Sequence, residues 1–219
     1  ADASNLVLRA AGLMPDTPAR ITLEKHLPAA AGIGGGSSDA AATLRALSDL
    51  GGTLPEAEAI RALGADVPVC LANCPTRMRG IGERLDPLPQ IPPAYLVLVN
   101  PGVGTPTASV FTALNGQFAD PMPKEFPDWP DAAAFAAWLR CQRNDLEGPA
   151  KTITPVIGDV LAALSVRPDC LLARMSGSGA TCFGLFTTAE AAQSASVAIS
   201  EIQPNWWVQA TPILDTRPG

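Results

Sequence analysis

The chain has 219 residues, of which 47% are hydrophobic and 16% are charged, and its formal net charge at pH 7 is −6. This length suits one large domain or two small ones with a sizeable apolar core. The acidic balance disfavours nucleic-acid binding, and no apolar run reaches the length of a membrane span. The five cysteines are unevenly spaced, which favours reduced thiols in a cytoplasmic protein over a disulfide framework or a zinc site.

The first part of the chain carries helix and strand patterns on either side of a glycine-rich stretch. Helices are predicted over residues 4–14, 37–50 and 55–64, and a strand is predicted over residues 19–28, where apolar and polar side chains alternate. Ser4 or Asn5 can cap the first helix. Ser37 or Ser38 can cap the second in the same way.

The rest of the chain mixes strands with helices. Strands are predicted over residues 94–102 and 206–214 and on both sides of a glycine loop within 170–186. Helices are predicted from residue 107 and over 131–141, 144–164 and 188–202, with a loop rich in proline and aspartate over 116–131. Such a mixture without a fixed repeat indicates an α+β fold with two layers.

The stretch GIGGGSSD, residues 32–39, lies between the predicted strand and a predicted helix. Glycines let the backbone approach a phosphate closely, and the free amides of a first helical turn attract anions. This arrangement favours phosphate binding over the alternative, an ordinary flexible loop capped by serine. It is neither a Walker A loop, because no Gly-Lys-Ser/Thr follows, nor the dinucleotide fingerprint.

Hydrolase and metal chemistry find little support in the sequence. His26 is the only histidine, which excludes a metal site built from several histidines. A serine hydrolase would need His26 as its base, and no G-x-S-x-G motif accompanies it. The sequence assigns no metal ligand and does not define an oligomeric state.

Several segments together resemble one family of small-molecule kinases. LPAAAGIGGGSSDAAA resembles the second motif of the GHMP kinases. The segments GADVPVC, MRGIGERLDPL, VNPGVGTPTASVF, RNDLE and MSGSGATCFGLF follow in that family's order. Within the superfamily, the likeness is to the kinases that act on 4-diphosphocytidyl-2-C-methyl-D-erythritol in non-mevalonate isoprenoid biosynthesis.

The resemblance implies the two-domain GHMP kinase fold. Residues 1–90 would form the remainder of an ATP-binding domain similar to the second domain of ribosomal protein S5. Residues 91–219 would form a ferredoxin-like C-terminal domain, and the domain that receives the last strand stays open. The family's N-terminal strands, with their lysine, have no counterpart here. We therefore expect this chain to be truncated and weakly active or inactive, because it lacks a positive charge that stabilises phosphoryl transfer.

The resemblance also implies roles for individual residues. Asp66 matches the catalytic base, and its alternative is a turn or cap aspartate. The residues implied to bind ATP are Asn5, Lys25, Pro28, Ala29, Ala30, Ala31, Gly32, Ile33, Gly34, Gly35, Gly36, Ser37 and Ser38. The residues implied to meet the substrate are Thr107, Phe111, Gly177, Ser178 and Gly179. The alternatives are a helix cap for Asn5, a solvated charge for Lys25, a core aromatic for Phe111 and a tight hairpin for 176–180.

The implied reaction is transfer of the γ-phosphoryl group of ATP, with Mg²⁺, to the 2-hydroxyl of the cytidine-diphosphate methylerythritol substrate. Two alternatives stay open at this point. One is another GHMP kinase with a different small alcohol as substrate. The other is a nucleotide-binding fragment or regulatory protein without turnover, which the missing lysine would explain.

Overall fold

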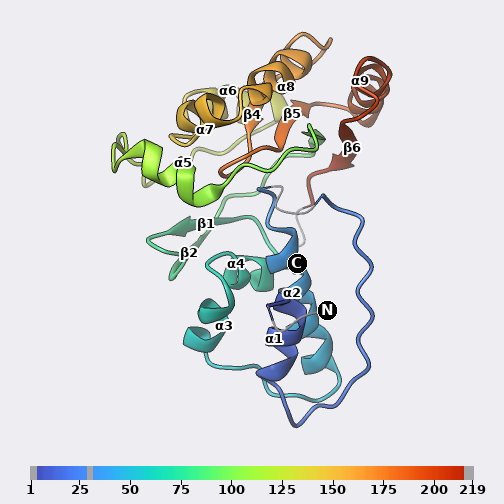
Figure 1. The fold of residues 1–219 in the computed structure, drawn as a ribbon. Coiled ribbons are helices and arrows are strands. Elements are labelled where there is room, and N and C mark those ends of the chain that lie inside the picture. The colour runs from blue at the N-terminus through green and yellow to red at the C-terminus, as the bar shows by residue number, and fades with distance from the viewer. Residues whose placement is uncertain (1–3, 29–31, 215–219) are drawn as a thin grey trace. The chain divides into compact units, whose positions relative to one another are not determined.

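The computed structural model describes residues 4–28 and 32–214, and these residues divide into two compact units (Figure 1). The first unit holds residues 4–26, 34–88 and 214, and the second holds residues 27–28, 32–33 and 89–213. The glycine-rich stretch therefore passes from the second unit to the first between Ile33 and Gly34. In the described ranges, no helix is both long enough and apolar enough to cross a membrane.

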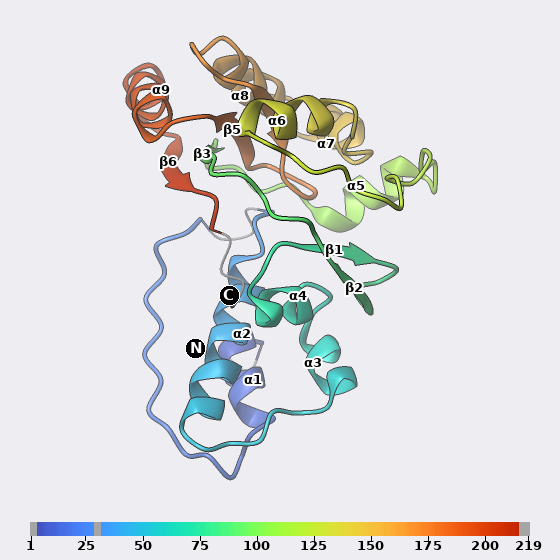
Figure 2. The same cartoon turned by 180° about the vertical axis from the view of Figure 1, so that it is seen from behind.

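Four helices form the core of the first unit as described. They are α1 (Leu6–Gly12), α2 (Gly35–Asp49), α3 (Ala57–Leu63) and α4 (Val67–Ala72). Helices α1 and α2 lie side by side in Figures 1 and 2. Ala10, Ala40 and Ala41 are fully buried between them, and such small side chains allow close packing. Leu44 and Val67 extend this apolar core to α4. Burial of one stripe on each short helix, rather than helix propensity alone, stabilises the arrangement.

A short hairpin completes the first unit, whereas the strand predicted over residues 19–28 is not formed. The hairpin pairs β1 (Thr76–Arg79) with β2 (Arg84–Pro87) in antiparallel register. Residues 19–26 instead run as an extended segment, seen in blue in both views. Alternating side chains alone do not make a strand, because its backbone groups need a partner strand, and the described residues of the unit provide none. Residues 19–23 and α2 line a groove of about 370 Å³.

The second unit is built on a four-stranded antiparallel sheet in the order β4–β5–β3–β6. Its strands are β3 (Tyr95–Asn100), β4 (Leu172–Met175), β5 (Cys182–Phe186) and β6 (Trp207–Pro212). The predicted strands at these places are confirmed. The last strand pairs with β3 from Tyr95↔Pro212 to Asn100↔Trp207, so it belongs to the second unit.

The helices of this unit are α5 (Thr107–Leu114), α6 (Ala132–Arg140), α7 (Glu147–Ile153), α8 (Val156–Ser165) and α9 (Ala189–Ile202). The helices α6, α8 and α9 pack on the sheet, whereas α7 packs against α5 and α8. Val97 and Val99 point to the face packed by α8 and α9, whereas Leu96 and Leu185 point to the face packed by α6 and Trp129. The strands are therefore apolar on both sides, which explains the continuous apolar run seen in the sequence.

The helix predicted over residues 144–164 proves to be two. Thr154, the residue before a proline, has φ −132° and ψ 78° and ends α7. Pro155 then caps α8, since a proline disfavours helical geometry at the residue before it and suits a helix start. The predicted helices from residue 107 and over 131–141 and 188–202 are confirmed, and residues 116–130 form a loop.

Candidate active site

The N-terminus of α2 presents glycines to an open surface. Gly34 is the N-cap in the left-handed conformation with φ 68°, and Gly34 O accepts the first helical hydrogen bond from Ser38 N at 2.9 Å. Ser37 and Ser38 are therefore inside the helix, and the prediction that one of them caps it is wrong. A glycine can turn the chain into the helix directly, which leaves the serine side chains free of that task. The amides of the first turn have no helical acceptor and remain available to an anion.

Asp66 lies at the start of α4 in the same unit. Its backbone occupies the N-cap position, but its carboxylate makes no capping hydrogen bond, and the described residues donate none to it. The side chain is exposed. The alternative of a capping aspartate is thus not supported, because the side chain does no capping.

The turn before Asp66 lies beside the start of α2. A Cβ at Gly64 would be 3.8 Å from Ser37 Oγ. Behind this turn, a Cβ at Gly82 of the hairpin would be 2.5 Å from Ala65 O. The first unit therefore brings the proposed base and the open end of α2 close together, with the hairpin backed against the turn that carries Asp66.

Charges around this turn act on the thiol of Cys70. Burial raises the pKa of Cys70, and the nearby negative charge of Asp66 raises it further, whereas Arg45 opposes both. The Arg45 guanidinium also donates to Cys70 O at 2.7 Å. The balance of these effects raises the pKa of Cys70 and favours its neutral thiol form. All five cysteines are unpaired, as the sequence predicted.

Two further residues expected near ATP have defined partners in the first unit. Asn5 Oδ1 accepts from Val7 N at 2.9 Å and caps α1, so this alternative is confirmed. Lys25 forms an ion pair with Asp39 of α2, although its side chain stays 55% exposed. Their contacts to a nucleotide stay predictions. The expected ATP-binding residues Ala29, Ala30 and Ala31 lie outside the described residues.

The start of the glycine stretch packs on the loop between β4 and β5 in the second unit. A Cβ at Gly32 would lie 2.5 Å from Gly179 O and 2.9 Å from Ser176 O. Ser176 Oγ donates to Gly32 O at 2.9 Å. Pro28 and Ile33 belong to the same unit. Two glycine loops far apart in sequence are thus in direct backbone contact.

The expected substrate residues also meet in the second unit. Thr107 Oγ1 and Ser178 Oγ form a hydrogen bond of 2.8 Å, so the loop at 177–179 is tied to the first residue of α5. Phe111, one turn further along α5, is 47% exposed. The alternative that Phe111 is a core aromatic is therefore wrong, and its ring is accessible to a ligand.

Some residues that shape these loops were not singled out from the sequence. Asn144 Nδ2 donates to Met175 O at 3.1 Å and to Gly177 O at 2.8 Å. Buried Asn100 donates to Thr181 Oγ1 at 2.9 Å and supports the end of the same loop. Both lie within segments on which the family resemblance rests. The sequence could point to those segments but not to the contacts.

No group of three or more histidine, cysteine, aspartate or glutamate side chains that could hold a metal ion occurs among the described residues. The side chains described here therefore do not define a metal site built from protein ligands alone.

Comparison with known proteins identifies the class to which this fold belongs. The GHMP kinases N terminal domain matches residues 3–75, and the GHMP kinases C terminal domain matches residues 124–205. A crystal structure of 4-(cytidine 5'-diphospho)-2C-methyl-D-erythritol kinase aligns with a TM-score of 0.72 and 36% identity, over 94% of this chain and 77% of that one. Homoserine kinase from Cytophaga hutchinsonii aligns with a TM-score of 0.61 at 21% identity, over 87% of this chain and 68% of that one, which shows a shared fold alone.

Sequence relatives narrow the class to one family. The 4-diphosphocytidyl-2-C-methyl-D-erythritol kinase of Cereibacter sphaeroides is 56% identical over 94% of this chain and 74% of the relative. The enzyme of the same name from Paracoccus denitrificans is 56% identical over 96% of this chain and 74% of the relative. The chain belongs to the 4-diphosphocytidyl-2-C-methyl-D-erythritol kinase family of the GHMP kinases.

Proposed function

We propose that this chain carries the catalytic machinery that transfers the γ-phosphoryl group of ATP to the 2-hydroxyl of 4-diphosphocytidyl-2-C-methyl-D-erythritol. The observation that carries the proposal is 56% identity to kinases of that name over 94% of the chain. The local geometry supports it, since an uncommitted carboxylate lies in the same unit as an open, glycine-rich helix start. The unpaired cysteines suit a reducing compartment, so we place the reaction in the cytoplasm.

Asp66 is proposed as the general base. A tertiary alcohol is a poor nucleophile until its proton is accepted, and a positioned carboxylate can accept that proton as the oxygen attacks phosphorus. The Asp66 carboxylate is exposed and has no donor among the residues described, so no internal hydrogen bond must break before it binds the hydroxyl.

The start of α2 is proposed to hold the phosphates of ATP. Its first-turn amides point out of the helix, the helix dipole favours negative charge there, and no atom lies within 4 Å of a Cβ position at Gly34. Ser37 and Ser38 add hydroxyl groups at this end. Mg²⁺, when bound with ATP, would neutralise charge on the transferring phosphoryl group. Because the described side chains form no metal cluster, we propose that the phosphates supply most of its ligands.

The second unit is proposed to bind the cytidine part of the substrate through α5 and the 176–179 loop. Phe111 offers an exposed ring on which a base can stack, a contact worth about 1–3 kcal/mol in single-stranded nucleic-acid complexes. Thr107 and Ser178 hold each other by a hydrogen bond and can redirect their hydroxyls to a ligand. These assignments make the choice of substrate a property of the second unit.

The experiment that tests the function is a coupled ADP-release assay on this chain. It compares the cytidine-diphosphate substrate with homoserine and mevalonate. We expect turnover with the first acceptor alone, at the low rate already expected for this chain, and a further loss of about a thousandfold in D66N, as expected for removal of a general base. The matched control is D49N, an exposed aspartate at the end of α2, which should keep full activity.

The controls separate the alternatives. Turnover with another alcohol would point to a different GHMP kinase. ATP binding without turnover would point to a nucleotide-binding protein. The second result requires a repeat with the lysine-bearing N-terminal segment of a relative fused to the chain. Continued inactivity of that fusion would overturn the proposal.

A further inference from the structure

A short connection between α6 and α7 holds the loop that is proposed to meet the substrate. We call residues 142–147 the brace segment. Its central residue, Asn144, donates from Nδ2 to Met175 O at 3.1 Å and to Gly177 O at 2.8 Å. Its Oδ1 accepts from Leu146 N at 3.0 Å, next to the start of α7. One side chain therefore joins the first turn of a helix to the backbone of a loop more than thirty residues away along the chain.

The Asn144 side chain uses each of its hydrogen-bonding functions in this site. A carboxylamide has two N–H donors and one carbonyl acceptor, and all three are used here. A carboxylate of the same shape would place an oxygen against two backbone carbonyl oxygens and could donate nothing. Gly177 has φ 53°, so its peptide is turned in a way that presents its carbonyl to Asn144. The structure thus uses the chemistry of Asn144 and not merely its volume.

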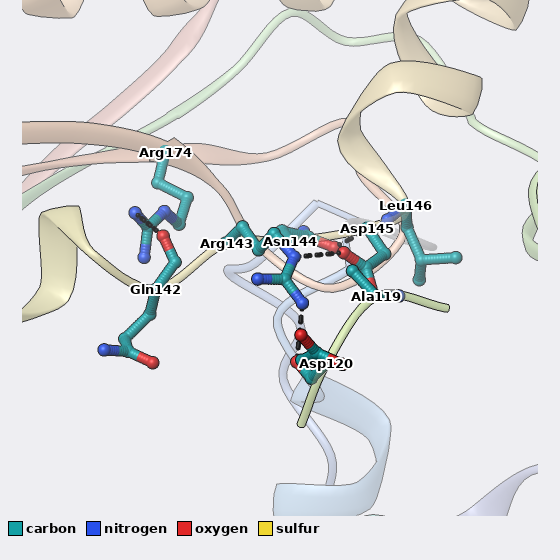
Figure 3. A network of polar contacts seen from close by, with 8 residues as sticks. All are labelled: Ala119, Asp120, Gln142, Arg143, Asn144, Asp145, Leu146 and Arg174. Atoms are coloured by element: carbon teal, nitrogen blue, oxygen red, sulfur yellow. Dashed lines mark hydrogen bonds and ion pairs between the residues drawn. The ribbon is translucent and has the colours of Figure 1, made fainter. Parts of the chain in front are cut away.

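The neighbours of Asn144 anchor the brace segment elsewhere. Figure 3 shows the Arg143 and Asp145 side chains directed toward Ala119 and Asp120. Arg143 donates to Asp145 Oδ1 at 3.0 Å and to Asp120 O at 2.5 Å, and Ala119 N donates to Asp145 Oδ2 at 3.1 Å. These contacts fasten the segment to the loop before α6, whereas Asn144 donates to Gly177 O and Glu147 Oε2 accepts from Met175 N at 3.4 Å.

A further contact fixes the brace segment at its first residue. The Arg174 guanidinium of β4 donates to Gln142 O at 2.8 Å, as Figure 3 shows. It also donates to Leu139 O at 2.9 Å. Burial lowers the pKa of Arg174, and the nearby Glu147 carboxylate opposes that change. Because Arg174 and Met175 are adjacent in β4, the same strand holds both the segment and the start of the loop.

We propose that Asn144 is a positioning residue that sets the conformation of the 176–179 loop for substrate binding. The inference rests on the proposed function of that loop. Gly177 follows Ser176, which bonds to Gly32 O, and precedes Ser178, which bonds to Thr107. Holding the Gly177 carbonyl therefore fixes the residue between the loop's two other side-chain anchors.

Two neighbouring isosteric substitutions test this. N144D replaces both donors by a carboxylate, whereas D145N makes the opposite swap one residue later and loosens only the contacts to Arg143 and Ala119. We expect the KM for the cytidine substrate to rise about tenfold in N144D, as two lost hydrogen bonds imply, and to change less than twofold in D145N. Lowering the pH should reduce the increase in KM of N144D and leave the KM of D145N unchanged, because a protonated carboxyl group at position 144 regains one donor.

Hydrogen exchange gives a readout without turnover. The amides of Ser176 and Gly179 are bonded to Thr181 O and Ser176 O within the loop. Their exchange should accelerate about tenfold in N144D and stay unchanged in D145N, at a temperature where all three proteins are folded. Equal effects of the two variants, or faster exchange with unchanged substrate affinity by calorimetry, would overturn the inference. If substrate binds without turnover and its affinity depends on Asn144, the proposed function fails while this inference stands.

Discussion

Gly32 and Gly34 lie two residues apart and both have positive φ, yet the space around them differs. A Cβ at Gly32 would collide with two backbone oxygens, Gly179 O at 2.5 Å and Ser176 O at 2.9 Å. A Cβ at Gly34 would meet no atom within 4 Å. The first glycine is required by the close approach of another loop. The second is required by backbone conformation and leaves open space above the start of α2.

This difference shows how one motif can combine a closely packed glycine with an open helix start. At Gly32, the absence of a side chain allows the backbone of the glycine stretch to pack against the 176–179 loop within the second unit. At Gly34, the absent side chain leaves first-turn amides uncovered in the first unit, where a phosphate can reach them. Glycine thus allows a close backbone contact at Gly32 and leaves the surface open at Gly34.

The largest effect is expected from G32A. Alanine at φ 71° is strained, and its methyl group would overlap a backbone oxygen that no rotamer change can remove. We expect the free energy of unfolding to fall by about 3 kcal/mol, with the loss of the contact between the two loops. Urea unfolding measures the first effect, and faster hydrogen exchange at Ser176 and Gly179 measures the second.

G148A is the matched control for this substitution. Gly148 lies in α7 of the same unit, without positive φ and without any atom within 4 Å of a Cβ. Alanine there should stabilise the helix by up to about 1 kcal/mol. If the free energy of unfolding falls no more in G32A than it changes in G148A, the close backbone approach at Gly32 does not stabilise the protein as proposed.

G82A extends the comparison to the hairpin beside Asp66. Gly82 has φ 97°, and its Cβ would lie 2.5 Å from Ala65 O, so it resembles Gly32 and not Gly34. We expect a loss of about 2–3 kcal/mol in the free energy of unfolding, together with reduced turnover because the turn that carries Asp66 must shift. Urea unfolding and the ADP-release assay test this pair of effects. Unchanged turnover in a destabilised G82A protein would show that the hairpin does not position Asp66.

Much of the second unit could be predicted because its local patterns and its packing agree. The apolar run at 94–102 and the capped helix at 188–202 are both formed, with Thr188 Oγ1 accepting from Ala191 N at 3.1 Å. The strand predictions were wrong where the pairing of two segments, rather than their own side-chain pattern, determines the structure. Residues 19–28 have a strand pattern but no described partner, and the β1–β2 hairpin has partners but no alternating apolar pattern.

In the candidate site, too, the sequence indicated contiguous segments but not the contacts between them. Resemblance indicated Asp66, the glycine stretch and the 176–179 loop, because these are contiguous segments with unusual composition. It could not show that Asn144 reaches Gly177, since a bond across that sequence distance depends on the fold. It also could not separate Gly32 from Gly34, because their difference lies in what surrounds them.

G34A should have a moderate effect on stability and a larger one on nucleotide binding. The left-handed conformation costs alanine about 1–2 kcal/mol, with no collision to add. If phosphate occupies the open space, the methyl group should also weaken ATP binding, which calorimetry measures. G34N is the matched variant, because asparagine tolerates this conformation better and should recover part of the stability but not the affinity. Normal ATP affinity in both variants would refute the assignment of this surface to the nucleotide.

The smallest effect is expected from S176A, which separates hydrogen bonding from packing at the Gly32 contact. Ser176 Oγ donates to Gly32 O at 2.9 Å, and alanine removes this bond without introducing an overlap. We expect a loss of about 1 kcal/mol, well below that of G32A, because the two backbones can still touch. S176T is the control, since it keeps the hydroxyl and should retain most of the stability. If S176A were as destabilising as G32A, the hydroxyl rather than the close backbone approach would be the main link between the loops, and Gly32 would be needed chiefly to expose its carbonyl.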